Sequence, residues 1–174
     1  MSKNNELIRP GYWIGHILAV VATIVGVYLA ASVGFKKAVE LELLRADRGT
    51  YYVAKSLLSQ TEVNLAQFDQ FIQKTNGKSR IKDEIQGIHL NDFVIQSAKF
   101  SESTFELDPQ VLTEVSQFYS NLRASFDAYH PEKPEALMES IRKETEFMRS
   151  GPLERLEKHV SELHDLCKSK GLDL

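Results

Sequence analysis

The hydrophobic pattern divides the chain into an apolar N-terminal stretch and a long amphipathic remainder. The apolar stretch covers 26 residues, 10–35, which contain no Asp, Glu, Lys or Arg. As an α-helix it would be about 39 Å long, against about 30 Å for the hydrocarbon core of a bilayer. We therefore predict an N-terminal tail over residues 1–10, a transmembrane helix over residues 11–35 and a helical domain over residues 36–174.

A retained membrane anchor competes with a cleaved signal peptide as the interpretation of this stretch. Tyr12 and Trp13 lie at its start, where aromatic rings prefer the headgroup level. Lys3 and Arg9 would suit the positive region of a signal peptide, and Ala30–Ser32 offers small residues for cleavage. The apolar core of a signal peptide is usually only about 7–15 residues long, so we favour the anchor. No later segment is apolar enough to span, so we expect a single-pass protein.

Small residues gather on one side of the predicted transmembrane helix. Successive members are three or four residues apart, and all seven fall within an arc of about 140°. Small residues let helix backbones approach closely in lipid, although Gly and Ala are also common in membrane helices generally. We expect this small-residue stripe to contact a membrane helix of an integral membrane partner or of a second copy. The stripe consists of Gly11, Gly15, Ala19, Ala22, Gly26, Ala30 and Gly34.

His16 lies beside the stripe, about one turn inside the predicted membrane interface. An ionisable residue in a membrane helix is a candidate functional group, here an axial haem ligand or a proton-handling side chain. The alternative is a neutral His near the headgroups that is hydrogen-bonded to lipid or to a partner helix. We favour this alternative because the apolar stretch contains no second His.

Cations flanking the apolar stretch give a small bias in orientation. The N-terminal side offers Lys3 and Arg9, and the C-terminal side offers more, namely Lys36, Lys37, Arg45 and Arg48. The positive-inside rule therefore favours a plasma (inner) membrane protein with a cytoplasmic helical domain, and a cytoplasmic N-terminal tail is the alternative. The absence of an Asn-x-Ser/Thr sequon and the single cysteine both fit a reducing compartment. Lys36 and Lys37 are candidates for contact with anionic lipid headgroups, or simply part of a solvated helix face.

Residues 36 to about 75 are predicted to form one long helix that leaves the membrane. Apolar or small positions recur there with a period near 3.6, at Leu43, Thr50, Ala54, Leu57, Thr61, Leu65, Phe68 and Ile72. The turn residues 75–79 end this pattern.

Residues 80–107 leave two interpretations open. One is a helical turn or two up to Gly87, followed by a short helix that Asn91 or Asp92 caps and that runs through Ala98. The other is a hairpin built from residues 93–100 and 104–107. No Asn-Gly or Asp-Gly turn joins those two runs, so we favour short helix and loop.

Three further helices have clear start and stop signals. Asp108 is an N-cap residue with Pro109 at the first helical position, and the apolar face that follows continues to Tyr129. The next helix begins near Pro134 and presents one face made of Leu137, Ile141, Glu144 and Met148. Gly151-Pro152 separates it from a last helix that ends near Gly171 and carries Leu153, Leu156, Val160, Leu163 and Cys167 on its apolar face. The pattern predicts an all-α protein, with one transmembrane helix and an antiparallel bundle of three to four main helices.

One arrangement of short motifs resembles that of poorly characterised single-pass bacterial membrane proteins with a short helical domain. It consists of residues 62–65 in the first long helix, a polar connection, residues 105–109, and then Phe118, Tyr119 and Leu122. The resemblance covers roughly residues 12–130. The chain departs from those proteins in the middle segment, where they often carry a Trp, because its single Trp is Trp13. No functional residue is carried over from this resemblance.

Neither the composition nor the motifs of the chain indicate a catalytic, cofactor-binding or metal-binding site. The net charge of −3 argues against nucleic-acid binding through bulk charge, and one cysteine excludes an intrachain disulfide. His159 and His164 are five residues apart, so they do not share a helix face, and no Glu stands three residues before a His. Cys167 lies on an apolar helix face and is expected to be a buried structural thiol. We predict no catalytic, cofactor or metal site.

Two classes of function remain. The first is a non-enzymatic, membrane-anchored interaction protein, an accessory or structural subunit that docks through the stripe and the helical domain. The second is a membrane-anchored sensor or signalling module whose bundle binds a ligand. We favour the first, because a sensor would usually need a second span or an output domain, and the sequence indicates neither.

Overall fold

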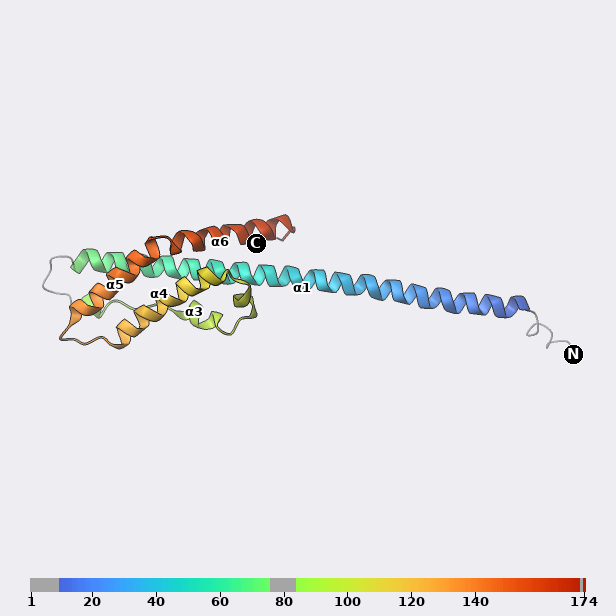
Figure 1. Cartoon of the computed structure of the whole chain (residues 1–174), viewed down its shortest axis with the longest axis horizontal. Helices are drawn as coiled ribbons and strands as arrows, with labels where there is room; N and C mark the ends of the chain where they lie inside the picture. Colours follow the sequence, from blue (N-terminus) through green and yellow to red (C-terminus); the bar gives the residue numbers. More distant parts are fainter. Residues whose placement is uncertain (1–9, 76–83, 173) are drawn as a thin grey trace. The chain divides into compact units, whose positions relative to one another are not determined.

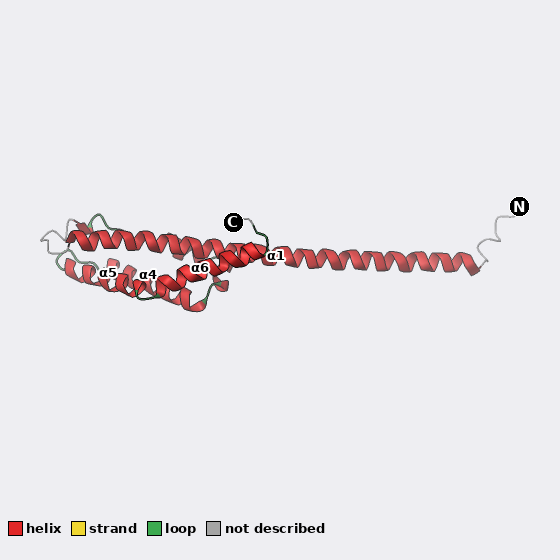
Figure 2. Ribbon diagram, turned by 90° about the horizontal axis from the view of Figure 1, so that it is seen from above, coloured by secondary structure: helices red, strands yellow, loops and turns green. Residues whose placement is uncertain are grey.

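The computed structural model describes residues 10–75, 84–172 and 174 of the chain. Over these residues the regular secondary structure is entirely helical, as predicted, and no strand occurs (Figure 2). The chain divides into two compact units, Met1–Leu43 and Leu44–Leu174, and each is described by itself. The predicted N-terminal tail lies outside the described residues, apart from Pro10.

Helix α1 (Pro10–Thr75) is a single helix of 66 residues. The predicted segments 11–35 and 36–75 join without a break, because no proline follows Pro10 within the helix and widely spaced glycines are tolerated in a helix interior. Its first part is apolar enough to cross a membrane, with a mean hydropathy of 2.3 over 18 residues, none of them buried. Signal sequences and apolar helices of soluble proteins share this length and composition.

The second unit has one hydrophobic core to which α1 and three later helices contribute (Figure 1). These are α4 (Pro109–Asp127), α5 (Pro134–Arg149) and α6 (Pro152–Ser169), and each of them contacts the other two. From α1, the core face takes residues three or four apart, as the predicted period requires: Ala54, Leu57, Thr61, Leu65 and Phe68 are all buried. Leu43 was expected on this face, but it belongs to the first unit and is 60% exposed.

The predicted helix starts are confirmed. The Asp108 carboxylate accepts the backbone N–H groups of Gln110 at 2.8 Å and Val111 at 3.2 Å, which caps α4. Pro109, Pro134 and Pro152 each stand in the first turn of their helix, where a missing N–H costs nothing. Gly151 ends the α5–α6 connection with φ at 148°, a conformation that favours glycine.

Between α1 and α4 the structure has short helices and loops, so the alternative hairpin is wrong. Helix α3 (Phe93–Ala98) follows Asp92 as predicted, and the 3₁₀-helix η1 (Glu102–Glu106) precedes Leu107. Residues 93–98 and 102–106 are helical, and Ile95 and Ala98 of α3 turn into the core at helical spacing. The predicted turn over residues 75–79 lies, beyond Thr75, outside the described residues.

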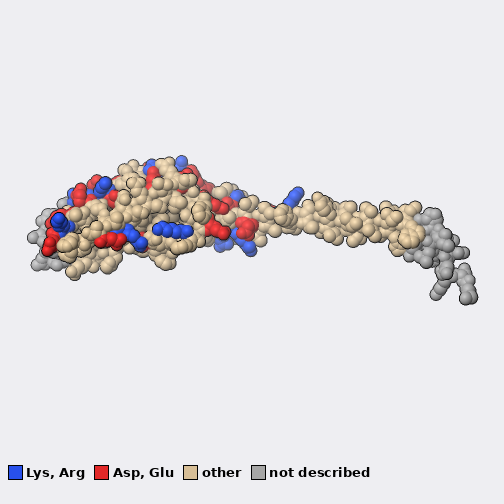
Figure 3. Space-filling model, turned by 60° about the horizontal axis from the view of Figure 1, so that its bottom comes forward, with Lys and Arg blue, Asp and Glu red and all other residues tan. Residues whose placement is uncertain are grey.

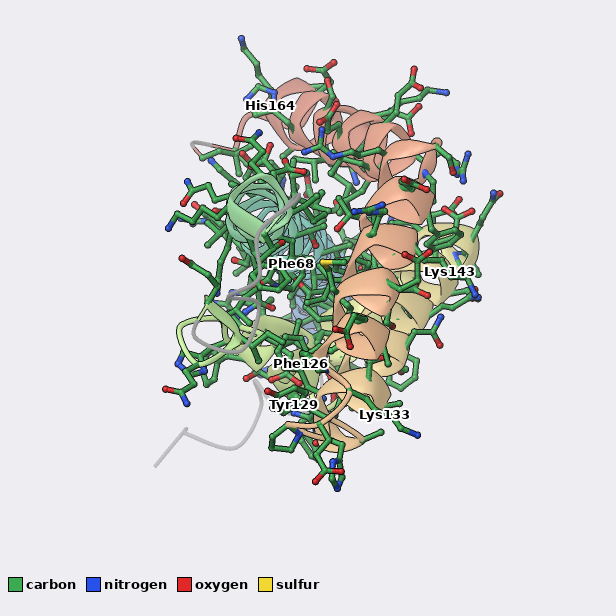
Figure 4. The ribbon with its side chains drawn as sticks, turned by 90° about the vertical axis from the view of Figure 1, so that its left-hand side faces the viewer. Phe68, Phe126, Tyr129, Lys133, Lys143 and His164 are labelled. Atoms are coloured by element: carbon green, nitrogen blue, oxygen red, sulfur yellow. The ribbon has the colours of Figure 1, made fainter. Side chains whose placement is uncertain are left out.

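Aromatic residues in and just after α4 pack as expected. Phe118 and Tyr119 are buried, and Phe126 and Tyr129 are half-buried against the same core. The rings of Phe68 and Phe126 have their centroids 6.4 Å apart. Figure 4 places Phe68 in the interior of the unit and Lys143 on the outer side of α5.

Polar contacts tie the helices of the second unit together. Arg155 of α6 binds the Glu114 carboxylate with two N–H groups, at 2.7 and 2.9 Å, which is a bidentate pair. This contact holds the pKa of Glu114 below its usual value. Lys170 pairs with Asp47 of α1. Glu144, predicted on the inner face of α5, is buried and accepts a hydrogen bond from Asn121 of α4 at 3.1 Å.

Candidate functional site

All seven residues of the small-residue stripe lie on α1, and all are exposed. A Cβ atom added to any of its four glycines would lie in open space, with no neighbouring atom within 4 Å. The described part of the chain therefore gives these glycines no packing role. Contact of the stripe with another molecule stays a prediction.

Polar residues of the first unit form short contacts along α1. The Thr23 hydroxyl donates to the carbonyl oxygen of Ala19 at 2.8 Å, so this hydroxyl is satisfied within its own helix. Lys37 donates to Glu40 at 2.9 Å, and both side chains are largely exposed. His16 and Lys36 are exposed as well. The predicted roles of His16, Lys36 and Lys37 stay predictions.

In the second unit, two amide side chains on α1 hold the segment that leads into α3. Asn64 is fully buried, donates to the Asn91 carbonyl oxygen at 2.6 Å and accepts the Asn91 N–H at 3.1 Å. One turn earlier, Gln60 donates to the Asn91 side-chain oxygen at 2.8 Å and accepts the Val94 N–H at 3.1 Å. We call Gln60, Asn64 and Asn91 the amide clamp. Its four hydrogen bonds fix the start of α3 against α1.

Tyr119 of α4 joins the amide clamp from the other side. Its hydroxyl accepts a hydrogen bond from Asn64 at 3.1 Å and lies 3.3 Å from the Thr61 hydroxyl. Burial raises the pKa of Tyr119, so the side chain stays a neutral hydroxyl. Sequence analysis missed the clamp. Amides within a helical pattern are typical of a solvated face, and Asn64 and Asn91 are 27 residues apart.

A hollow of about 290 Å³ lies beside the clamp, between α3 and α4. Its polar lining comes from both helices and their ends: Gln96, Lys99, Ser116, Ser120, Arg123 and Asp127. Arg123 is paired with Asp92, the residue that precedes α3. Sequence analysis did not predict this hollow, because its two walls are brought together only by the tertiary fold.

A second, more apolar groove of about 310 Å³ lies between α1 and α3, with Tyr52, Val53, Phe93 and Val94 among its lining residues. Phe93 is 74% exposed, and Phe100 and Phe105 nearby in sequence are 92% and 85% exposed. Exposed phenylalanines in one short segment are typical of interaction surfaces, whereas a single one is unremarkable. On the face that Figure 3 shows, charged side chains are spread over the second unit, while the apolar part of α1 shows almost none.

The remaining titratable candidates have local roles. The ring of His159 accepts the Asp108 N–H at 3.3 Å, and the ring of His164 packs 5.9 Å from that of Tyr51. Cys167 is buried, as expected, and burial raises the pKa of its thiol. Within the described ranges no three His, Cys, Asp or Glu side chains are placed to hold a metal ion together.

Compared with protein-family models, curated proteins and solved structures, the chain shows no match in any of the three. The resemblance to single-pass bacterial membrane proteins therefore stays a prediction.

Proposed function

We propose that this chain is a non-enzymatic, membrane-anchored interaction protein, acting as an accessory or structural subunit of a membrane complex. In this proposal, the N-terminal part of α1 crosses the plasma membrane once. The second unit is an antiparallel helical bundle, and it lies in the cytoplasm. The small-residue stripe docks against a membrane helix of another protein or of a second copy.

One observation carries this proposal: all seven stripe residues are exposed, and within the described residues a Cβ added to any of the four glycines would meet no atom within 4 Å. The four stripe glycines weaken the apolar part of α1, since each Gly in a helix interior lowers helix stability by about 1 kcal/mol relative to Ala. A close helix–helix contact in the membrane would offset that cost, because small residues let two backbones approach. The exposed phenylalanines around α3 supply a second surface for the same partner.

Replacing Gly26, at the centre of the stripe, tests the proposed contact. Gly26→Leu should push the helices apart and weaken association by about 1–3 kcal/mol, by analogy with overpacking in protein cores. Val25→Leu, off the stripe, should leave association unchanged. Both variants stay hydrophobic, so both should insert. In-membrane crosslinking gives the readout, and the mass of the product distinguishes a partner from a second copy. Equal crosslinking of both variants and the wild type would remove the support for the stripe.

Cysteine labelling tests the proposed orientation. A Cys at the exposed position of Glu157, in a Cys167→Ser background, should resist a membrane-impermeant thiol reagent in intact cells and react after permeabilisation. Efficient labelling in intact cells would place the helical domain outside and contradict the proposal. Mass spectrometry of the labelled chain gives its mass, and a loss of mass at the N-terminus would indicate a cleaved signal peptide.

A further inference from the structure

We propose that the hollow between α3 and α4 binds a small zwitterion of the α-amino-acid class. Its volume of about 290 Å³ lies at the lower end of the range for small-molecule sites. This inference goes beyond the proposed membrane contact and does not depend on it, because every residue concerned belongs to the second unit.

Two cations, one from each wall, are held at the hollow by a chain of polar contacts. Arg123 of α4 pairs with the Asp92 carboxylate, to which Gln96 also donates, at 3.2 Å. Gln96 in turn accepts a hydrogen bond from the Lys99 ammonium at 3.0 Å. Asp92 and Gln96 thus orient both cations and leave most of their N–H groups unused, since a guanidinium offers five and an ammonium three.

These unused donors suit a ligand carboxylate. Ser116 and Ser120 stand on the same face of α4 as Arg123, about one turn apart along the helix. Within the described residues, their hydroxyls make no hydrogen bond. A carboxylate has two oxygens that accept about four hydrogen bonds, so two cationic donors and a hydroxyl match it well.

Asp127 supplies the opposite charge. It stands one turn beyond Arg123 and also lines the hollow, and its carboxylate has no partner within the described part of the chain. Asp92 is not itself a lining residue, but its carboxylate neutralises the lining residue Arg123, so Lys99 and Arg123 together balance Asp92 and Asp127. A zwitterion adds no net charge, and it places its ammonium and carboxylate only a few ångströms apart. Ile95 and Ala124 leave room for a short aliphatic side chain.

The amide clamp makes the site rigid before any ligand arrives. Gln60 and Asn64 fix the backbone that carries Asp92, and Tyr119, which lines the hollow, bonds to the same Asn64. A wall that is fixed in advance spares the ligand the cost of ordering it. The short α3, of six residues, therefore does not have to move to form the site.

Three probes that share an isobutyl group test the assignment on the full-length protein in detergent micelles. L-Leucine carries both charged groups, 4-methylpentanoate lacks the ammonium, and 3-methylbutylamine lacks the carboxylate. We expect L-leucine to bind about tenfold or more tightly than either single-charge probe, because each charged group adds its own hydrogen bonds. Isothermal titration calorimetry measures this, with empty micelles as the blank. Absence of L-leucine binding at millimolar concentration overturns the proposal, as does equal binding of 4-methylpentanoate.

Two variants assign the charged groups. Lys99→Gln should weaken L-leucine binding about tenfold. Asp127→Asn should abolish the preference for L-leucine over 4-methylpentanoate, an effect that a merely structural role would not produce. Lys143→Gln, on the outer side of α5, is the matched control and should change nothing. The three positions are exposed, so all variants should unfold like the wild type. Retained discrimination in Asp127→Asn contradicts the proposed site.

Discussion

Two glycines of the same helix α1 have opposite surroundings. A Cβ added to Gly49, in the second unit, would come within 2.5 Å of the Ser103 hydroxyl, so a side chain there would have to displace a neighbour within the chain. A Cβ added to Gly26, in the first unit, would meet nothing. The larger residues repeat the contrast, since Phe68 is completely buried and Leu29 is 56% exposed.

The contrast shows which part of α1 has its environment within the chain. From Thr50 onwards, apolar residues at helical spacing belong to one core together with residues of α3, α4, α5 and α6. In the first unit, apolar residues are exposed all round the helix, and burial of each in lipid or against protein is worth about 1.5–3 kcal/mol. A helix that is hydrophobic all round belongs in a membrane or a core. Substitutions in the two segments should therefore affect different measurements.

The largest effect is expected from Phe68→Ala. The deleted ring leaves a cavity next to Phe126, which should lower the free energy of unfolding of the second unit by about 3–5 kcal/mol. Urea denaturation of the full chain in micelles, followed by circular dichroism, measures this loss. Leu29→Ala, in the first unit, is the matched control and should leave that transition in place. A similar loss from both would show that the two segments unfold as one.

A smaller loss is expected from Asn64→Ala. The change removes both hydrogen bonds from the buried Asn64 side chain to the Asn91 backbone, which should cost about 1–3 kcal/mol. Thr23→Ala is the control, because its hydroxyl only back-bonds to Ala19 on the same exposed helix. The same denaturation assay applies, and hydrogen exchange of the Val94 amide should rise along with it. Unchanged protection at Val94 would mean that the clamp does not hold α3.

Replacing each of the two glycines by leucine tests the contrast between the two parts of α1 directly. Gly49→Leu should destabilise the second unit by about 1–2 kcal/mol, because its side chain collides with η1 at Ser103. It should leave membrane crosslinking unchanged. Gly26→Leu should do the reverse, with normal unfolding and lost crosslinking. A variant that altered both measurements would break the separation between the two parts of α1.

The smallest effect concerns pH. Because the pKa of Glu114 is lower in the folded than in the unfolded chain, its stabilisation is present above the ordinary value of 4.5 and lost as pH falls through the folded pKa. Glu114→Gln should therefore cost less than about 1 kcal/mol at neutral pH, and its difference from the wild type should shrink below about pH 4.5. Glu40→Gln, which removes the exposed pair with Lys37, should change nothing. A difference that grows towards acid would contradict this assignment.

Signals between residues that are close in sequence predicted much of the fold. Asp108 with Pro109, and Gly151 with Pro152, mark boundaries because the capping side chain and the helix it caps are neighbours in sequence. The period of Leu57, Leu65 and Phe68 likewise follows from one helix facing one core. Leu43 continued that period beyond the core and misled the prediction, since periodicity does not state where the covering helices end.

The candidate sites were much less predictable. Asp92 and Arg123 are 31 residues apart and pair only because α3 lies against α4. Sequence spacing describes one helix face at a time, so it finds ligand sets within a helix and misses those built from two. Asn64 illustrates the same limit, because a helical amide is read as solvent-exposed unless its distant backbone partner is known.

The buried thiol of Cys167 has a practical consequence. Since the sequence contains one cysteine and it is fully covered, a thiol reagent can reach it only when the C-terminal part of α6 lifts away. The labelling rate is then the rate of an open thiol multiplied by the fraction of molecules that are open, and each tenfold slowing corresponds to about 1.4 kcal/mol. The labelling rate of Cys167 in the wild-type protein therefore reports how often the end of α6 opens. A partner that binds over α6 would lower this rate, and a partner that pulls α6 away would raise it.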